Sequence, residues 1–102
     1  MLGTISVSRS DTETIVSITG QFVFDLHRPF RATYLEEKGA QKKQFIVDMS
    51  CVKYLDSAAI GMLLTMRDET GAADREIIIK NAHGQVLRTL EVTNMHQFFQ
   101  IR

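Results

Sequence analysis

The stretch FIVDMSCVKYLDSAAIGMLL, residues 45–64, decides the fold. Its opening run FIVDM, residues 45–49, is short and apolar, which is typical of a strand buried on both faces of a parallel sheet. From Ser57 to Thr70 apolar residues recur at three- and four-residue spacing and Gly71 follows, so this segment predicts a helix. We therefore expect a strand that ends near Asp48, a short loop, and a helix that begins at Ser57.

Strands are also predicted on both sides of this unit. EIIIK, residues 76–80, reads as a second buried strand, so residues 45–80 predict a strand-helix-strand unit. Residues 4–9 alternate in polarity and residues 14–19 are rich in β-branched side chains, which together predict an antiparallel hairpin whose second strand ends at Gly20.

Further helices are predicted before and after the central unit. Asp25 is a candidate cap for a helix that carries Leu26, Phe30 and Tyr34 at four-residue spacing and stops at Lys38-Gly39. Residues 85–91 predict a short helix, and the tail predicts one helical turn and a short extended piece. The expected fold is an α/β single domain, residues 1–102. Its mixed sheet has four to five strands, an N-terminal hairpin and about four helices packed largely on one face.

Composition excludes several function classes. The 12 basic and 12 acidic residues of the 102-residue chain cancel, which argues against a protein that works by broad attraction to nucleic acid or anionic lipid. The sequence has neither a signal-peptide pattern at its start nor an apolar run of about 18 residues, so we expect a cytoplasmic protein without a membrane segment. Cys51 has no second cysteine with which to form an intrachain disulfide or a thiolate zinc cluster.

Asp56 and Ser57 stand where the loop is expected to enter the helix. The first N–H groups of a helix lack internal partners, and either side chain could accept a hydrogen bond from one of them. A cap is therefore one interpretation of this pair. The other is functional, because Asp48, Asp56 and Ser57 are expected to meet at the carboxyl end of a parallel strand, where ligands and partners gather.

The run at 45–64 resembles the central signature of STAS domains, above all the bacterial anti-anti-sigma factors. ITGQFVFD at 18–25 and EIIIKNAHGQVLRTLEVTNMHQFFQI at 76–101 extend the resemblance over nearly the whole chain. The resemblance implies that Ser57 is phosphorylated by a partner that is both anti-sigma factor and kinase, and that a serine phosphatase resets it. The partner-binding residues that it implies are Asp25, Asp48, Asp56, Ser57, Ala58, Ile60 and Gly61. Ala58 and Ala59 depart from the family pattern, which often carries a second hydroxyl next to the serine.

Enzyme chemistry has little support in the sequence. His27, His83 and His96 lie in different segments, and Leu55 stands where a nucleophile-elbow glycine would be, so we expect no catalytic, metal or cofactor site. Phe22 and Phe24 are either core residues or part of a docking surface. Two functions remain: an anti-anti-sigma factor, expected to be a monomer, that switches partners, or a STAS accessory subunit of a bacterial lipid-transport ATPase complex.

Overall fold

The computed structural model describes residues 3–35, 44–70 and 77–102. Within these ranges it contains five strands, three α-helices and two 3-10 helices, close to the helix number expected. Their order is β1 (Thr4–Arg9), β2 (Glu13–Phe22), η1 (Phe24–Leu26), α1 (His27–Leu35), β3 (Gln44–Leu55), α2 (Ser57–Glu69), β4 (Ile77–Lys80), α3 (Gly84–Val92), η3 (Met95–Gln97) and β5 (Gln100–Ile101).

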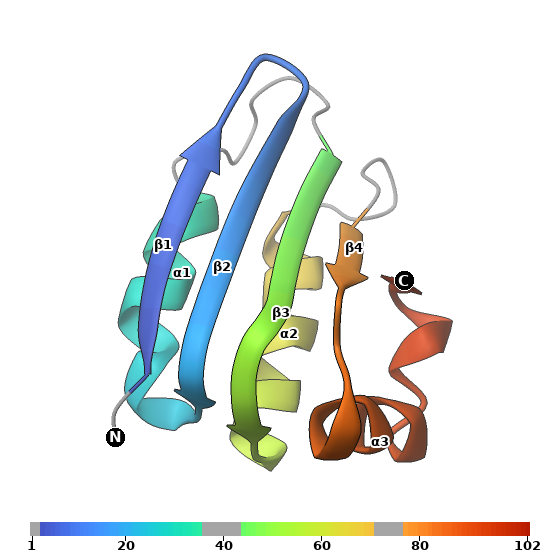
Figure 1. Cartoon of the computed structure of the whole chain (residues 1–102). Coiled ribbons are helices and arrows are strands. Elements are labelled where there is room, and N and C mark those ends of the chain that lie inside the picture. Colours follow the sequence, from blue (N-terminus) through green and yellow to red (C-terminus); the bar gives the residue numbers. More distant parts are fainter. Residues whose placement is uncertain (1–2, 36–43, 71–76) are drawn as a thin grey trace.

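The strands form one mixed sheet in the order β1-β2-β3-β4-β5. β1 and β2 are antiparallel, as the predicted hairpin requires, whereas β2, β3, β4 and β5 pair in parallel. Figure 1 shows α1 and α2 side by side behind the sheet, with α3 across the lower end of β4. The predicted α/β fold with a mixed sheet and an N-terminal hairpin is confirmed.

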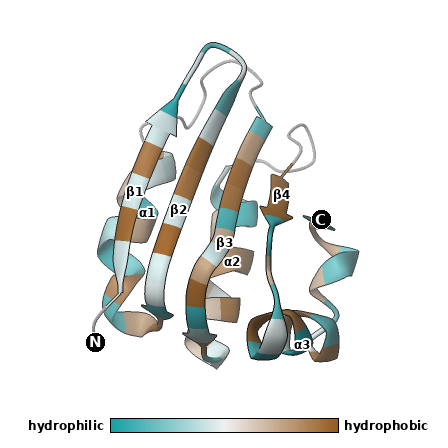
Figure 2. Ribbon diagram, in the orientation of Figure 1, coloured by the Kyte–Doolittle hydropathy of each residue, from teal (hydrophilic) through white to brown (hydrophobic). Residues whose placement is uncertain are grey.

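The hydrophobic core lies between the sheet and these helices. Alternate residues of β3, among them Phe45, Val47 and Met49, are fully buried because they point toward α1 and α2. Leu63 and Met66 supply the facing side chains from α2. In Figure 2 hydrophobic bands alternate with paler or hydrophilic bands along β1, β2 and β3, while the tip of the β1–β2 hairpin is hydrophilic.

Both central strands are longer than their sequences predict. β2 does not end at Gly20 but continues to Phe22, and Gly20 lies inside it with a φ of 87°. β3 does not end near Asp48 but runs on to Leu55, so the expected loop at 50–55 is wrong. The added part of β3 pairs with residues 19–22 of β2 across two register shifts, and each strand therefore satisfies backbone hydrogen bonds of the other.

The entry to α1 also differs from the prediction. Asp25 does not cap a helix: it lies within the 3-10 turn η1, whose N-terminal flanking residue is Val23. The core residues Leu26, Phe30 and Tyr34 are buried as their spacing predicts. The predicted stop at Lys38-Gly39 falls outside the described residues.

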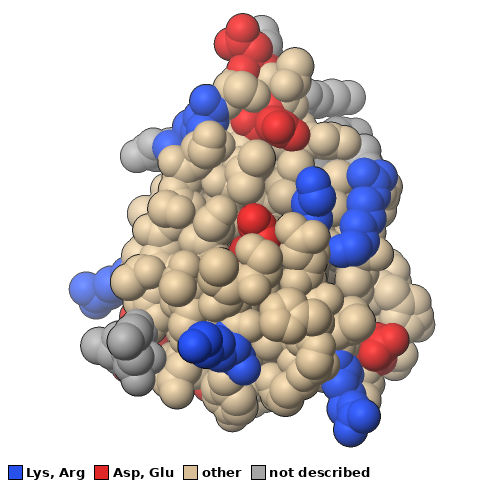
Figure 3. Space-filling model, in the orientation of Figure 1, with Lys and Arg blue, Asp and Glu red and all other residues tan. Residues whose placement is uncertain are grey.

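On the sheet face turned away from α1 and α2, the described residues form no broad cluster of one charge. Figure 3 shows that face as mainly uncharged surface, with basic and acidic side chains in separate small groups among the described residues. Within the same residues, none of the helices combines the length and apolar character needed to cross a bilayer.

Candidate functional site

Asp56 caps α2. Its backbone is extended, and its Oδ1 accepts a hydrogen bond from the backbone N–H of Ala59 at 3.0 Å. This contact satisfies one of the amide groups that a helix start leaves without an internal partner. The capping interpretation is therefore correct for Asp56.

Ser57 does not share that task. It is the first residue of α2, its side chain is exposed, and no hydrogen bond to its hydroxyl is present among the described residues. Because the neighbouring carboxylate already caps the helix, the Ser57 hydroxyl is free to meet solvent or another protein. A serine in this position is open to modification without loss of the cap.

A groove lies next to Ser57, between α1 and α2. It has a volume of about 400 Å³, and its walls are mainly apolar. We call it the α1–α2 groove. It is lined by Phe24, His27, Phe30, Arg31, Tyr34, Ala58, Gly61, Met62 and Thr65.

Helical geometry places Ser57 at the rim of this groove. Ala58, Gly61, Met62 and Thr65 recur at the three- and four-residue spacing of one helix face, which is the face that α2 turns toward the groove. Ser57 precedes Ala58 by one residue and so points about 100° away from that face. A group attached to Ser57 would stand beside the opening.

Phe24 forms the exposed wall at the same end. Its side chain is 58% exposed, and its ring stacks on that of His27 with centroids 4.3 Å apart. A hydrogen bond of 3.0 Å between His27 Nδ1 and the Phe24 carbonyl holds the pair. Phe22, in contrast, is fully buried, so Phe22 is a core residue and Phe24 is a surface residue.

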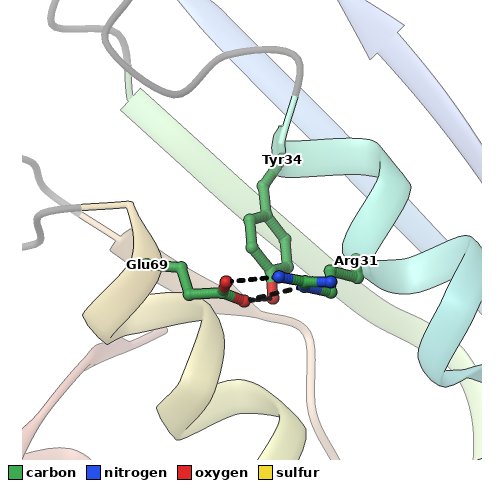
Figure 4. Close-up of polar contacts among 3 residues, drawn as sticks. All are labelled: Arg31, Tyr34 and Glu69. Carbon is green, nitrogen blue, oxygen red and sulfur yellow. Dashed lines mark hydrogen bonds and ion pairs between the residues drawn. The ribbon is translucent and has the colours of Figure 1, made fainter.

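A polar cluster at the edge of the groove joins α1 to α2 (Figure 4). The guanidinium of Arg31 donates two hydrogen bonds to the Glu69 carboxylate, at 3.1 and 2.8 Å, and the Tyr34 hydroxyl donates a third at 2.8 Å. Burial raises the pKa of Tyr34, and its hydrogen bond to Glu69 raises it further. The same carboxylate raises the pKa of Arg31.

Asp48 is not part of the site around Ser57. Its Oδ1 accepts hydrogen bonds from the Ser50 backbone N–H at 2.9 Å and from Asn81 Nδ2 at 3.3 Å. Burial alone would raise its pKa, but these hydrogen bonds and the Lys80 charge together lower it. Leu55, at the end of β3 that leads to Ser57, lies seven positions beyond Asp48, which corresponds to roughly 20 Å of strand.

The other predicted site residues divide between surface and core. Ala58 and Gly61 line the groove, and Asp25 is exposed on η1, a turn that contacts α2. Ile60 is only 8% exposed and belongs to the core. The candidate surface therefore excludes Ile60.

Several groove residues were absent from the sequence-based prediction. His27, Arg31 and Met62 carry no motif, and only their spacing could have found them. His27, Phe30, Arg31 and Tyr34 repeat at three and four residues, which places them on one face of α1. Which other helix that face meets depends on the tertiary structure.

Metal binding has no support within the described ranges: no group of three or more potential ligands from histidine, cysteine, aspartate or glutamate occurs there.

Comparison with known proteins places this arrangement in a family. The family model described as "Mlab, STAS domain" matches residues 5–101. The chain belongs to the STAS-domain family. A STAS-domain containing protein of Pseudomonas aeruginosa strain UCBPP-PA14 is 35% identical over 94 residues, which cover 92% of this chain and 92% of that protein.

Solved structures share the STAS fold at low sequence identity. A putative anti-sigma factor antagonist from Thermotoga maritima superposes with a TM-score of 0.80 at 16% identity, over 95% of this chain and 84% of that one. The antagonist SpoIIAA from Bacillus, in its phosphorylated form, gives a TM-score of 0.66 at 13% identity, over 97% and 91%. The murine anion transporter Slc26a9 gives 0.69 at 18% identity, over 97% of this chain and 20% of the transporter.

Proposed function

We propose that this STAS domain is an anti-sigma factor antagonist that works by partner switching. In its unmodified form it binds an anti-sigma factor that is also a serine kinase, and the bound sigma factor is freed. Phosphorylation of Ser57 releases the domain, and a serine phosphatase resets it. The observation that carries the proposal is the exposed Ser57 hydroxyl, which stands beside an apolar groove while Asp56 alone caps the helix.

The charge of a phosphate is sufficient to end such an interaction. Phosphoserine adds roughly 1.5 to 2 negative charges at neutral pH. At about 5 Å from the Asp56 carboxylate, two charges are repelled by about 1.7 kcal/mol at the dielectric constant of water. This repulsion is present in the free domain as well, but it rises to about 7 kcal/mol at an effective dielectric constant of 20 when a docked partner excludes water, and this increase weakens binding. A hundredfold loss of affinity requires only about 2.7 kcal/mol.

The phosphate should leave the domain folded. The start of a helix attracts anions, an effect worth roughly 0.3–1 kcal/mol at an exposed position. Ser57 is exposed, so the added phosphate can extend into solvent without displacing core side chains. The switch therefore acts on binding and not on folding.

Affinity capture with two baits tests the proposal. A Ser57→Ala bait should retain a partner from the native cells that a Ser57→Glu bait does not, and the retained protein should transfer phosphate from ATP to Ser57 of the wild-type domain. Peptide mass spectrometry locates that phosphate. Phosphate on another residue, or equal retention by both baits, would refute the proposal.

A second function is favoured by a different observation. The matching family model is described as "Mlab, STAS domain", and a transporter is among the structural neighbours, so the domain could instead be an accessory subunit of a transport complex. In that case both baits would retain the same transporter subunits. The free hydroxyl of Ser57 favours the first function, because an accessory subunit needs no modifiable group there.

A further inference from the structure

We propose that the α1–α2 groove receives an amphipathic helix of the partner that Ser57 controls, with apolar side chains in the groove and carboxylates along α1. The inference rests on the proposed function and specifies which kind of partner segment binds. Three features of the domain support it: the backbone chemistry of the groove walls, Gly61, and the charges on α1.

The walls of the groove favour a helix over an extended segment. Both walls are helices, α1 and α2, whose backbone groups are already paired within each helix. An extended peptide would therefore bury unpaired N–H and C=O groups against apolar side chains, which is costly. A helix satisfies its own backbone groups and presents only side chains.

Gly61 permits a close approach. It lies in the middle of α2, where glycine costs about 1 kcal/mol relative to alanine. A Cβ at this position would meet no heavy atom of the described chain within 4 Å, so packing within the domain does not require glycine. We infer that the missing side chain makes room for a backbone from another molecule, and this backbone would pass next to Ser57.

The dimensions of the groove fit two to three helical turns. Its lining spans Phe24 to Tyr34 on one side and Ala58 to Thr65 on the other. At 1.5 Å per residue these walls are about 15 and 10 Å long. Phe24 stands exposed at one end, where an aromatic side chain can act as an anchor in an interface.

The basic residues along α1 would attract acidic residues that flank the apolar face of the partner helix. Residues 27–35 contain Arg28, Arg31 and His27 and no acidic residue. Arg31 is already paired with Glu69, whereas the exposed Arg28 makes no hydrogen bond or ion pair with the described residues. A shallow hollow lined by His27, Arg28 and Arg31 extends along this side of α1. Carboxylates of the partner helix would be attracted there.

A larger side chain at Gly61 tests whether the partner helix occupies the groove. Gly61→Leu should weaken binding of the partner captured with the Ser57→Ala bait by about tenfold or more, because the leucine occupies the space left for the partner backbone. The urea midpoint of the isolated domain should stay the same or rise, since leucine is the better helix former. Arg88→Leu on α3 is the matched control and should bind like wild type.

Charge reversal tests the acidic flank. Arg28→Glu should lower the affinity roughly tenfold, with a smaller loss at high salt. Arg88→Glu makes the same change of charge away from the groove and should have no effect. Equal effects of the two substitutions would overturn the assignment of the acidic flank to α1.

Cross-linking identifies the segment. A photoreactive side chain at Thr65, inside the groove, should attach to a partner peptide with an apolar helical repeat and flanking carboxylates. Attachment to an extended or basic segment would overturn the inference. So would Gly61→Leu binding at full affinity, or a groove filled by a second copy of this chain, seen as dimers that Gly61→Leu abolishes. Each of these results leaves the Ser57 dependence standing, so this inference can fail separately from the proposed function.

Discussion

Asp56 and Ser57 are neighbours with different roles. The carboxylate of Asp56 holds the first turn of α2, whereas the hydroxyl of Ser57 makes no contact within the described residues. The sequence predicted a cap at this pair but could not assign it, since either side chain can accept the hydrogen bond. The assignment depends on backbone geometry, which places Asp56 in the extended conformation that a capping residue adopts.

Substitution of each residue should separate the two roles. Asp56→Ala removes the cap and should lower the free energy of unfolding by about 1 kcal/mol. Ser57→Ala removes no hydrogen bond and should change it by less than about 0.5 kcal/mol. Urea unfolding followed by circular dichroism measures both. Equal destabilisation by the two substitutions would contradict the assignment of the cap to Asp56.

The pair formed by α1 and α2 builds the groove, and the Arg31–Tyr34–Glu69 cluster fixes it. The hydrogen bond from Tyr34 is the best protected part of the cluster, because Tyr34 is only 2% exposed. Tyr34→Phe removes that hydrogen bond to Glu69 Oε1. We expect a loss of about 1 kcal/mol in the free energy of unfolding, measured by urea titration at pH 7. Arg28→Lys, at an exposed position of the same helix, is a control that should leave stability unchanged.

The stability of the domain should depend on pH at alkaline values because the pKa of Tyr34 is raised. In the unfolded chain tyrosine ionises near pH 10, while in the folded domain burial and the Glu69 hydrogen bond keep the phenol protonated to higher pH. The stability that this residue contributes is complete below about pH 10 and is lost as pH rises toward the folded-state value. The melting temperature should therefore fall more steeply between pH 8 and pH 11 for the wild type than for Tyr34→Phe. Parallel curves would contradict the burial of the phenol.

At the scale of the whole molecule, the order of strands and helices could be predicted from the sequence, but the position of the site within the sheet could not. The buried runs FIVDM and III mark β3 and β4 correctly. SCVKYL reads as a loop because Ser50 and Lys53 are polar, yet the long β2 pairs with it and makes it a strand. That pairing is a tertiary effect, and it leaves roughly 20 Å of strand between Asp48 and Leu55, the end of β3 that leads to Ser57.

The position of Asp48, well before the end of β3 that leads to Ser57, predicts that it takes no part in partner binding. Asp48→Asn should leave the affinity for the partner unchanged, since the carboxylate faces Ser50 and Asn81 and not the groove. Asp25→Asn is the comparison, because Asp25 is exposed on η1, next to α2. Isothermal titration with the captured partner distinguishes them. Loss of binding with Asp48→Asn at unchanged stability would extend the docking surface onto the sheet.

The most direct test of the account is the affinity of the partner for the domain with and without phosphate on Ser57. The phosphorylated domain is prepared with the partner kinase, separated from the unmodified protein, and titrated at physiological salt while circular dichroism monitors its fold. The account predicts at least a hundredfold weaker binding, which is about 2.7 kcal/mol, with an unchanged spectrum. Equal affinity of the two forms, or an unfolded phosphorylated form, would contradict it.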